Sequence, residues 1–587
     1  MENLDIAHVL EELADLLEIQ GANPFRIRAY RNAVRTVEGL TRPMRAMVDA
    51  GEDLTGLPAI GKDLAEHIVE LVQTGRMTRL EKLSEEFPRS LVELMRLDGV
   101  GPKKARKLFD ALGVRTVDDL EAALQAGKVE ELDGFGKKSA EKILQAIQDH
   151  RKHVGRFLLD DVEQLLAPVL EHVRGAAGVG RVEVAGSFRR RKETIGDVDL
   201  LAEFDGDGTA VVQHFVEYPG ADRVEAAGGT KGNIVLRSGL SIDLRVIPPR
   251  SFGAALQYFS GSKEHNVAMR TRAVRKGLRV NEWGVFRVPE GADLETPGNP
   301  EGERLAGETE EGVYEALGMA WVPPELRENR GEVEASLAGS LPRLVTLEDI
   351  RGDLQMHSTW SDGKASLEEM ARACRDRGYE YVAITDHSQA MAMVQGLTPE
   401  RARAQWVEVE GVRERVTDIE ILKSAEVDIL KDGTLDLPDE ILEGLDVVVV
   451  SVHSFMDQDK TTMTERVLRA IRHPEVDILA HPTGRLLNRR EPFELDVEAV
   501  LTAAAELGVA VELNANPNRL DLSDVHVLRA KELGVKVVIS TDAHAPRGLD
   551  NIRFGVDQAR RGWLEQKDVL NAMPVADFRA WLRRREG

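Results

Sequence analysis

Residues 186–199 read GSFRRRKETIGDVD, and this stretch decides how the middle of the chain folds. It ends in Asp197 and Asp199, which alternate along an expected strand, so that both carboxylates face the same side. A third carboxylate, Asp243, follows in the strand-like run 241–245. Three converging carboxylates are costly unless they bind divalent metal. The sequence therefore predicts a site at which two Mg²⁺ ions would stabilise the attacking and leaving oxygens of a phosphoryl transfer.

The start of the same stretch supplies groups that suit a triphosphate. Backbone N–H groups at Gly186 and Ser187 are expected to cradle it, with Arg190 as a charged partner. An Asp-x-Asp pair alone also fits solvated aspartates at a strand end, but the upstream Gly-Ser and the downstream Asp243 favour a metal site. This combination is typical of nucleotidyltransferases in general, including those that act on RNA ends or antibiotics. Around it we expect a mixed sheet with strands at 182–185, 198–202, 234–236 and 242–247.

Three glycine-containing turns, at 57–62, 97–103 and 132–137, divide the helical N-terminal region. Glycines permit backbone conformations that a side chain would forbid, and the helix that follows points free N–H groups at a bound anion. One copy could be an ordinary helical hairpin, but three copies resemble helix-hairpin-helix motifs, which grip the DNA backbone without reading sequence. The first copy is imperfect, with Ala59 at its first glycine. The residues expected to contact DNA are Gly61, Gly99, Gly101, Lys103, Gly134 and Gly136.

From about residue 346 short apolar strands alternate with helices, which indicates parallel βα units and a barrel. The expected strands lie at 381–384, 447–452, 478–480, 509–513 and 535–539. Several end in His or Asp, and in such folds the carboxyl ends of the strands carry the active site. Imidazoles mixed with carboxylates predict a multinuclear Zn²⁺ or Mn²⁺ site that lowers the pKa of bound water and neutralises a phosphate. The candidate ligands are His357, Asp362, His387, Glu426, His453, His481, Asp542 and His544.

Composition bounds the remaining possibilities. The 587 residues predict several domains, and a net charge of −24 argues against an indiscriminate polycationic nucleic-acid binder. A single cysteine excludes an internal disulfide and suggests a reducing compartment. No apolar run approaches the roughly 18 residues of a membrane span, and the acidic start is not a secretory signal. We therefore expect a cytoplasmic, nucleoid-associated monomer without a membrane anchor.

Residues 1–320 are similar over nearly their whole length to the family X DNA polymerases. The resemblance is carried by the glycine repeats, the Gly-Ser/Asp-x-Asp stretch and the run 255–262, ALQYFSGS, which continues to Asn266 and Arg270. It implies that Asp197, Asp199 and Asp243 hold the two metals and the primer 3′-hydroxyl. It further implies nucleotide binding by Gly186, Ser187, Arg190, Tyr258, Phe259, Gly261 and Asn266, with Arg270 near the template.

Residues from about 346 to 575 resemble the polymerase-and-histidinol-phosphatase (PHP) domain, a distorted αβ barrel with a three-metal phosphoesterase site. The resemblance implies that the eight C-terminal candidates are its ligands. One position departs from the pattern, because the usual His-x-His reads Gln355-Met356-His357 here. An amide oxygen is a weaker ligand than nitrogen for zinc, so we expect manganese to be favoured. Arg485 is a further candidate for orienting a substrate phosphate.

Two other departures concern the polymerase-like half. His67 stands where relatives with deoxyribose-phosphate lyase activity carry a Schiff-base lysine. Imidazole does not form a stable imine with a sugar aldehyde, so we expect lyase activity by that route to be absent or weak. Ser241 replaces an arginine beside the third aspartate, which is expected to change how the primer terminus is held.

Together these features predict a multidomain α+β and α/β protein. Its expected parts are a helical DNA-binding region at 1–155, a nucleotidyltransferase palm at 156–250, a thumb-like subdomain at 251–320, a polar linker at 321–345 and the PHP barrel at 346–587. The implied activity is repair synthesis with dNTPs in short gaps of gapped or nicked DNA, coupled to 3′→5′ trimming. The alternatives are a PHP phosphatase for small phosphoesters with an inactive polymerase module, and a non-catalytic DNA-end scaffold. Whether exonuclease, abasic-site endonuclease or 3′-phosphatase activity dominates stays open.

Overall fold

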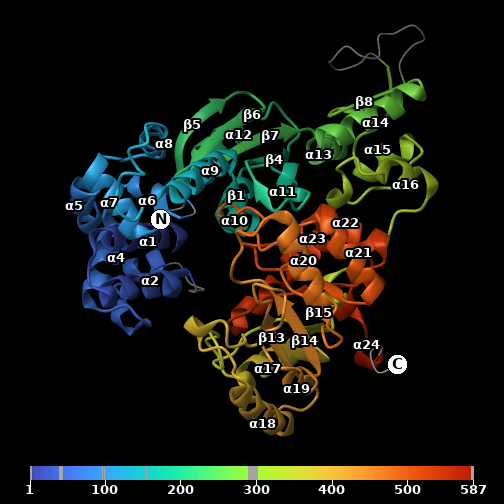
Figure 1. Cartoon of the computed structure of the whole chain (residues 1–587). Coiled ribbons are helices and arrows are strands. Elements are labelled where there is room, and N and C mark those ends of the chain that lie inside the picture. Colours follow the sequence, from blue (N-terminus) through green and yellow to red (C-terminus); the bar gives the residue numbers. More distant parts are fainter. Residues whose placement is uncertain are drawn as a thin grey trace. The chain divides into compact units, whose positions relative to one another are not determined.

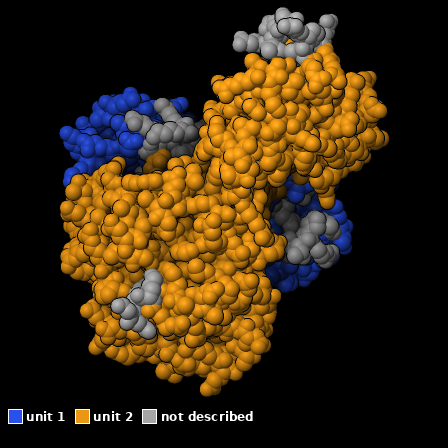
Figure 2. All heavy atoms as spheres, turned by 90° about the vertical axis from the view of Figure 1, so that its right-hand side faces the viewer, with its two compact units in different colours: residues 1–156, 164–167, 488–490 blue, residues 157–163, 168–487, 491–587 orange. Residues whose placement is uncertain are grey.

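The computed structural model describes residues 3–38, 44–95, 97, 99–153, 155–287 and 302–583. The chain falls into two compact units (Figure 2). The first holds residues 1–156 with 164–167 and 488–490, and the second holds 157–163, 168–487 and 491–587. Within the described ranges, no helix has the length and apolar character needed to cross a membrane.

The first unit is helical and is built on the apolar face of its first helix. Leu10, Leu13 and Leu17 of this helix are fully buried, at the spacing that places side chains on one face. They join a core to which the later helices contribute leucines and isoleucines. The helices are α1 Asn3–Gln20, α2 Pro24–Glu38, α3 Met44–Asp49, α4 Lys62–Thr74, α5 Thr78–Glu86, α6 Leu91–Met95, α7 Pro102–Leu112, α8 Val117–Gln125 and α9 Lys137–His153 (Figure 1).

The palm in the second unit contains the expected mixed sheet, with strands in the order β2-β4-β7-β6-β5. β4 and β7 are parallel, whereas the other neighbours are antiparallel. Helix α12 covers part of the sheet, and Gly232 of β6 leaves room for Val212 and Phe215 of that helix. The elements are α10 Leu159–Arg174, β2 Val182–Val184, α11 Gly186–Arg189, β4 Asp197–Glu203, α12 Thr209–Val216, β5 Ala221–Ala227, β6 Lys231–Leu236 and β7 Ser241–Ile247.

The thumb-like part follows as two consecutive helices and a three-stranded antiparallel sheet, ordered β10-β9-β8. Its elements are α13 Phe252–Ser260, α14 Lys263–Arg275, β8 Leu278–Asn281, β9 Gly284–Arg287, β10 Glu303–Ala306 and α15 Glu310–Ala316.

Residues 321–345 differ from the polar linker that the sequence suggested. They contain the short helices η3 Pro324–Leu326 and α16 Glu332–Ala338, and Leu326 and Val333 pack into the core of the thumb. Some polar side chains of this segment are buried and paired. Glu332 lies 2.6 Å from Nδ1 of His265, and both side chains are fully buried. Other acidic side chains pair outside the thumb, Glu325 with Arg560 and Glu328 with Arg190 and Arg561.

The C-terminal domain is a parallel seven-stranded sheet in chain order, β11 to β17. An isolated parallel bridge between Met356 and Ala543 joins the segments that follow the two outer strands, so the sheet is a nearly closed barrel. The strands are β11 Gly352–Asp353, β12 Tyr381–Ile384, β13 Glu420–Asp428, β14 Val447–Ser451, β15 Ile478–Leu479, β16 Ala510–Asn514 and β17 Val537–Ser540. The helices are α17 Leu367–Asp376, α18 Pro399–Arg415, α19 Asp439–Leu442, α20 Lys460–Ile471, α21 Val497–Leu507, α22 Asp524–Leu533, α23 Ile552–Arg561 and α24 Val575–Leu582 (Figure 1).

Alternate residues of the barrel strands enter two different cores, which explains why strands such as β12 and β14 are continuous apolar runs. In β14, Val448 and Val450 join the cluster shared with the surrounding helices, and Val447 and Val449 join a second cluster. Phe578 of α24 belongs to that second cluster. Its ring stacks on that of Tyr381, with the ring centroids 4.5 Å apart.

Candidate functional sites

The palm sheet brings the three predicted carboxylates to one face. β4 and β7 run parallel with Asp199 opposite Asp243, and Asp197 lies two residues before Asp199. Burial, together with the charges of Asp197 and Asp243, raises the pKa of Asp199 to about 6. The three side chains do not form a group whose ligand atoms all lie within 4.8 Å of one another. The site is therefore electrostatically suited to divalent cations.

Gly186 is required by its contact with this site. Its φ is +65°, and a Cβ atom there would lie 2.6 Å from Oδ2 of Asp199. Any side chain would have to displace either the carboxylate or helix α11. The Gly186-Ser187 turn thus sits directly against the carboxylates, at the start of α11.

Arg190 lies between the palm and the thumb. Its Nη1 donates to the carbonyl of Ser260 at 2.9 Å, and its Nε donates to Oε1 of Glu328 at 3.0 Å. The predicted triphosphate arginine is thus held by an acidic partner that the sequence did not point to. Ser241, the departure beside Asp243, accepts a hydrogen bond of 3.0 Å from Nδ2 of Asn233.

The predicted nucleotide pocket lies where α13 meets α14. Nδ2 of Asn266 donates to the carbonyl of Tyr258 at 2.7 Å. A Cβ atom at Gly261 would lie only 2.8 Å from Oδ1 of Asn266, so the glycine leaves room for the Asn266 side chain. The rings of Tyr258 and Phe259 are T-shaped with centroids 5.2 Å apart, and Arg270 is exposed on α14. Tyr258, Gly261 and Asn266 thus lie together at the junction of α13 and α14, and Arg190 donates to the carbonyl of Ser260 at this junction.

The glycine turns of the first unit share one backbone geometry. Gly99 and Gly134 have φ of +82° and +85°, and Ala59 of the imperfect copy has φ of +60°. Gly61 and Gly101 are the N-caps of α4 and α7 without a side-chain cap, so the first N–H groups of those helices are not satisfied by a capping side chain.

The second and third glycine turns are tied together. Nζ of Lys104 donates to the carbonyl of Gly99 at 2.8 Å and to Oγ of Ser139 at 3.3 Å. Lys103 and Gly136 are exposed beside this link. His67, on α4, is 3.1 Å from the hydroxyl of Tyr30 through Nδ1, and burial lowers its pKa.

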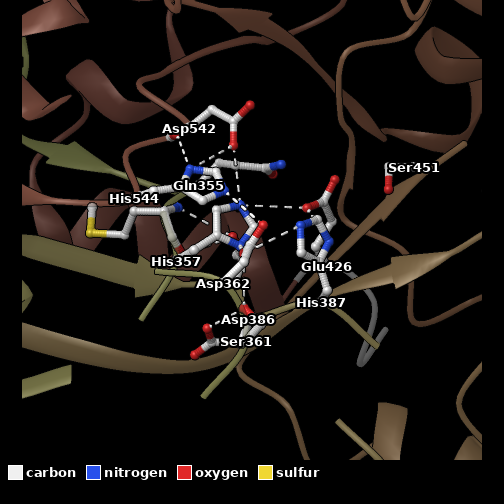
Figure 3. A network of polar contacts seen from close by, with 12 residues as sticks. Gln355, His357, Ser361, Asp362, Asp386, His387, Glu426, Ser451, Asp542 and His544 are labelled. Carbon is white, nitrogen blue, oxygen red and sulfur yellow. Dashed lines mark hydrogen bonds and ion pairs between the residues drawn. The ribbon is translucent and has the colours of Figure 1, made fainter. Parts of the chain in front are cut away.

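The C-terminal candidates converge at the carboxyl ends of the barrel strands (Figure 3). Glu426 is the centre of the cluster: its oxygens lie 2.9 Å from Nε2 of His481, 3.1 Å from Nδ1 of His387, 3.4 Å from Nε2 of His453 and 3.6 Å from Nε2 of His357. Two groups have ligand atoms that all lie within 4.8 Å of one another. They are His357, Asp362, His387 and His544, and His387, Glu426 and His453.

Asp542 completes the cluster through its Oδ1, 3.1 Å from Nε2 of His357. Burial would raise the pKa values of Glu426 and Asp542, but the neighbouring imidazoles outweigh it and keep both carboxylates ionised. Burial would lower the pKa of His453, but Glu426 and Asp428 raise it to about 10. Burial would also lower the pKa of His544, but Asp362 and Asp542 raise it to about 9.

The donor set fits divalent metal ions. Nδ1 of His357, Nδ1 of His481 and both amide atoms of Gln355 are buried and make no hydrogen bond to any described residue. Buried polar atoms without partners are costly, and a cation would satisfy those that carry lone pairs. Gln355, 1% exposed, lies among the cluster residues in Figure 3 rather than turned away from them.

Several buried groups around the cluster were not predicted. Glu512 accepts the backbone N–H of His481 at 2.6 Å, Asp386 accepts hydrogen bonds from Ser358 and Ser361, and Asp428 lies 3.3 Å from Nδ1 of His453. Nε of Arg519 is 3.7 Å from Oδ2 of Asp542. A carboxylate inside an otherwise apolar parallel strand, as in residues 510–514, is the signal that could have revealed Glu512.

Arg485 does not take the position that the sequence suggested. Its Nη2 lies 2.7 Å from Oε2 of Glu193, in the palm, and it also donates to the carbonyl of Leu520. The side chain is thus an ion-pair partner of the palm and lies outside both metal-ligand groups.

Comparisons with known proteins agree with this architecture. Profiles of a helix-hairpin-helix domain and of a SAM-like helix-hairpin-helix tandem match residues 1–77 and 91–149. The DNA polymerase beta thumb matches residues 255–328, which includes the first part of the segment expected to be a linker, and the PHP domain matches residues 353–516.

Similar proteins cover the chain in whole or in part. The DNA polymerase/3'-5' exonuclease PolX of Bacillus subtilis is 40% identical over 588 residues, 100% of both chains. DNA polymerase lambda of Rattus norvegicus is 26% identical over 56% of each chain. A probable phosphatase of Thermoanaerobacter is 29% identical over 39% of this chain and 93% of its own. The chain therefore belongs to the PolX family, the bacterial family X DNA polymerases that carry a C-terminal PHP domain.

Proposed function

We propose that the protein is a DNA polymerase that fills short gaps during DNA repair and trims 3′ ends with its PHP domain. The observation that carries this proposal is the presence of two separate acidic centres in one unit. Asp197, Asp199 and Asp243 share a face of the palm sheet, and the histidine cluster around Glu426 lies at the carboxyl edge of the barrel. The full-length similarity to a DNA polymerase/3'-5' exonuclease supports assigning one activity to each centre.

The residues of the two centres suit different ions. The three palm carboxylates offer hard oxygen ligands and suit Mg²⁺, with Gly186, Ser187 and Arg190 beside them for the triphosphate of a dNTP. The barrel cluster mixes imidazole and carboxylate and suits Mn²⁺ or Zn²⁺. When bound, such ions activate water and stabilise charge that develops on a phosphate. The chain's own contribution is to fix the ligands: Asp428 orients His453, and Glu512 holds the backbone of His481.

Exonucleolytic trimming is the 3′-end reaction that we assign to the PHP domain, on gapped or nicked DNA gripped by the glycine turns of the first unit. We propose that the protein works as a monomer on nucleoid DNA. The similarity of the C-terminal region to a probable phosphatase supports the rival in which small phosphoesters are the substrate. The placement of Asp199 opposite Asp243 on neighbouring strands, with Gly186 leaving room for Asp199, disfavours both that rival and a non-catalytic scaffold.

Substitutions in each centre test the assignment. Asp243→Ala should abolish nucleotide addition on a one-nucleotide gap, because the primer end loses a metal ligand, and should retain trimming of 3′ ends. His453→Ala or Glu426→Ala should abolish trimming and retain gap filling. Primer extension and 3′ trimming are measured for the full chain in parallel. Loss of both activities in a variant that is folded by circular dichroism would contradict two independent sites, and a wild type without gap filling would favour the phosphatase.

A further inference from the structure

An exposed aromatic ring stands next to the histidine cluster. Phe455 lies two residues after His453, and 52% of its surface is exposed. Its φ is +52°, in the left-handed region that bulky residues rarely adopt. An exposed apolar ring is unfavourable in water and the left-handed conformation is strained, so neither feature stabilises the fold. Strained residues of this kind concentrate where a ligand is bound.

A cation accompanies the ring. Nζ of Lys431 lies 5.2 Å from the centroid of Phe455. Lys431 follows β13, the strand that carries Glu426, and Phe455 follows β14, the strand that leads to His453. Because these strands are parallel neighbours, both loops leave the barrel at the edge where the metal ligands lie.

One buried guanidinium holds both loops in place. Arg466 of α20 is 2% exposed and donates to the carbonyl of Leu430 at 2.8 Å and to that of Ser454 at 2.9 Å. It also donates to the carbonyl of Ile429. Nε2 of Gln458 adds a bond of 3.1 Å to the carbonyl of Lys431. The ring and the ammonium group are therefore presented by a preformed support.

We propose that Phe455 and Lys431 form a subsite for the unpaired 3′-terminal nucleotides of DNA. The ring stacks on a base and the ammonium group pairs with a backbone phosphate, the combination that holds single strands without reading sequence. Within a duplex, base faces are covered by their neighbours, so the subsite selects frayed, mismatched or overhanging ends. The proposal rests on the proposed trimming activity and specifies which DNA ends it accepts.

The kinetic test compares Phe455→Ala with Phe455→Trp and with the control Leu507→Ala. Leu507 is an exposed residue, 44%, at the end of α21 and thus at the opposite edge of the barrel, before β16 begins. Substrates are an oligonucleotide with a single-stranded 3′ end and bis(p-nitrophenyl) phosphate, which has no base to stack. Loss of one stacked base should raise KM for DNA roughly tenfold in Phe455→Ala. The fall in kcat/KM should be at least ten times larger for DNA than for the small diester, and Phe455→Trp should resemble the wild type.

Lys431→Met should weaken DNA binding and reduce the slope of log Kd against log salt by about 0.7, the value for one phosphate on a single strand. Equal loss on both substrates in Phe455→Ala, or an unchanged KM for DNA, would overturn the subsite. An unchanged salt slope in Lys431→Met would remove the lysine from it.

A binding assay separates failure of the subsite from failure of the proposed activity. An oligonucleotide with 2-aminopurine as its 3′-terminal base is titrated with the full chain in EDTA. Stacking on Phe455 should quench its fluorescence in the wild type and in Leu507→Ala, and not in Phe455→Ala. If the wild type quenches but does not trim, the proposed activity is wrong and the subsite stands. If the wild type trims but Phe455→Ala quenches equally, the subsite is wrong and the proposed activity stands; such a result would leave Phe455 as a contact for another protein.

Discussion

Gln355 is the residue at which the barrel cluster departs from the ligand pattern that its sequence resembles. Both amide atoms are buried and make no hydrogen bond to the described part of the chain, and the side chain lies among the ligands (Figure 3). An amide can offer only a neutral oxygen to a cation, whereas an imidazole would offer nitrogen. The cluster therefore has a more oxygen-rich composition than a His-x-His motif would produce.

We expect trimming by the wild type to depend on Mn²⁺ and to be poorly supported by Zn²⁺. Gln355→His should bind Zn²⁺ more tightly, by tenfold or more, and depend less on added Mn²⁺. Isothermal titration with each metal measures affinity independently of activity, and trimming assays provide the second readout. Equal activation of the wild type by both metals would contradict this expectation.

Gly186 shows how one missing side chain sets a catalytic geometry. Its φ of +65° is unfavourable for any residue with a side chain, and a Cβ atom there would lie 2.6 Å from Oδ2 of Asp199. Both features exclude a side chain at this position. Gly186→Ala should therefore reduce gap filling by at least 100-fold, with 3′ trimming retained. Gly277→Ala is the matched control, because Gly277 has φ of +67° and no neighbour within 4 Å of a built Cβ. A comparable loss in both variants would assign the effect to backbone strain alone.

At the scale of elements, an ion-pair cluster joins α11 of the palm to α15 of the thumb. Arg189 donates both Nη groups to Glu310 at 2.7 Å, and the fully buried Arg327 donates to the same carboxylate at 2.6 Å. Burial would raise the pKa of Glu310, but the two arginines outweigh it and lower the pKa to about 2. The position of α11, and with it the Gly-Ser turn, thus depends on a charge located on the thumb.

This cluster predicts a pH-dependent stability. A carboxyl group whose pKa falls from 4.5 to about 2 on folding stabilises the fold above pH 4.5 and loses that contribution as pH falls toward 2. Glu310→Gln should therefore cost on the order of 2–3 kcal/mol at pH 7 and progressively less below pH 4.5. Calorimetry of the full chain at pH 7, 5 and 3.5 measures the difference, with the exposed neighbour Glu311→Gln as control. A cost that stays constant with pH would show that packing, not charge, is responsible.

At the scale of the second unit, the PHP domain contacts the palm beside Arg190, in part through a shared carboxylate. Oε1 of Glu328 accepts from Nε of Arg190 and from Nη1 of Arg561, each at 3.0 Å. Arg561 lies at the end of α23, is 2% exposed, and donates also to the carbonyl of Arg190 at 2.7 Å and to Asp524. Arg190, which is expected to bind a triphosphate, therefore shares the carboxylate of Glu328 with Arg561 of the PHP domain.

Opposite substitutions should move the affinity for dNTP in opposite directions. In Arg561→Met, Glu328 loses its partner in the PHP domain and keeps Arg190 at 3.0 Å and Lys192 at 3.9 Å. It then competes better with a triphosphate for Arg190, so KM for dNTP should rise severalfold. In Glu328→Gln that competition is removed and KM should fall. Single-turnover gap filling with varied dNTP measures both, and Arg560→Met, which loses the pair with Glu325, is the control. A rise in both variants would mean that the network is merely structural.

Much of this architecture could be predicted from the sequence. Where every residue of a strand is buried, the run of apolar residues is sufficient to locate the strand. The strand 381–384 was predicted with the bounds of β12, and the expected strand 447–452 ends one residue later than β14. Fully buried parallel strands appear as continuous apolar runs, so composition alone reveals them. Candidate ligands such as His387 and His453 were recognisable for a related reason, since they closely follow such runs, at the carboxyl edge where these folds carry their active sites.

Other features depended on residues far apart in the chain, and only the tertiary structure decided them. Residues 321–345 are polar in sequence, yet Glu332 is fully buried because Nδ1 of His265 and the backbone N–H groups of Asn329 and Arg330 hydrogen-bond to its carboxylate. Arg485 is adjacent to the His481 motif but pairs with Glu193, which lies 292 residues earlier. The position of Glu512 in an apolar strand could have revealed it, but nothing local identifies His481, whose backbone it holds, or the arginines that Glu328 pairs with. The sequence by itself determined the strands, the glycine turns and the candidate metal ligands, whereas the pairing of buried charges was decided by the fold, because a charge can be buried only where a partner from another element meets it.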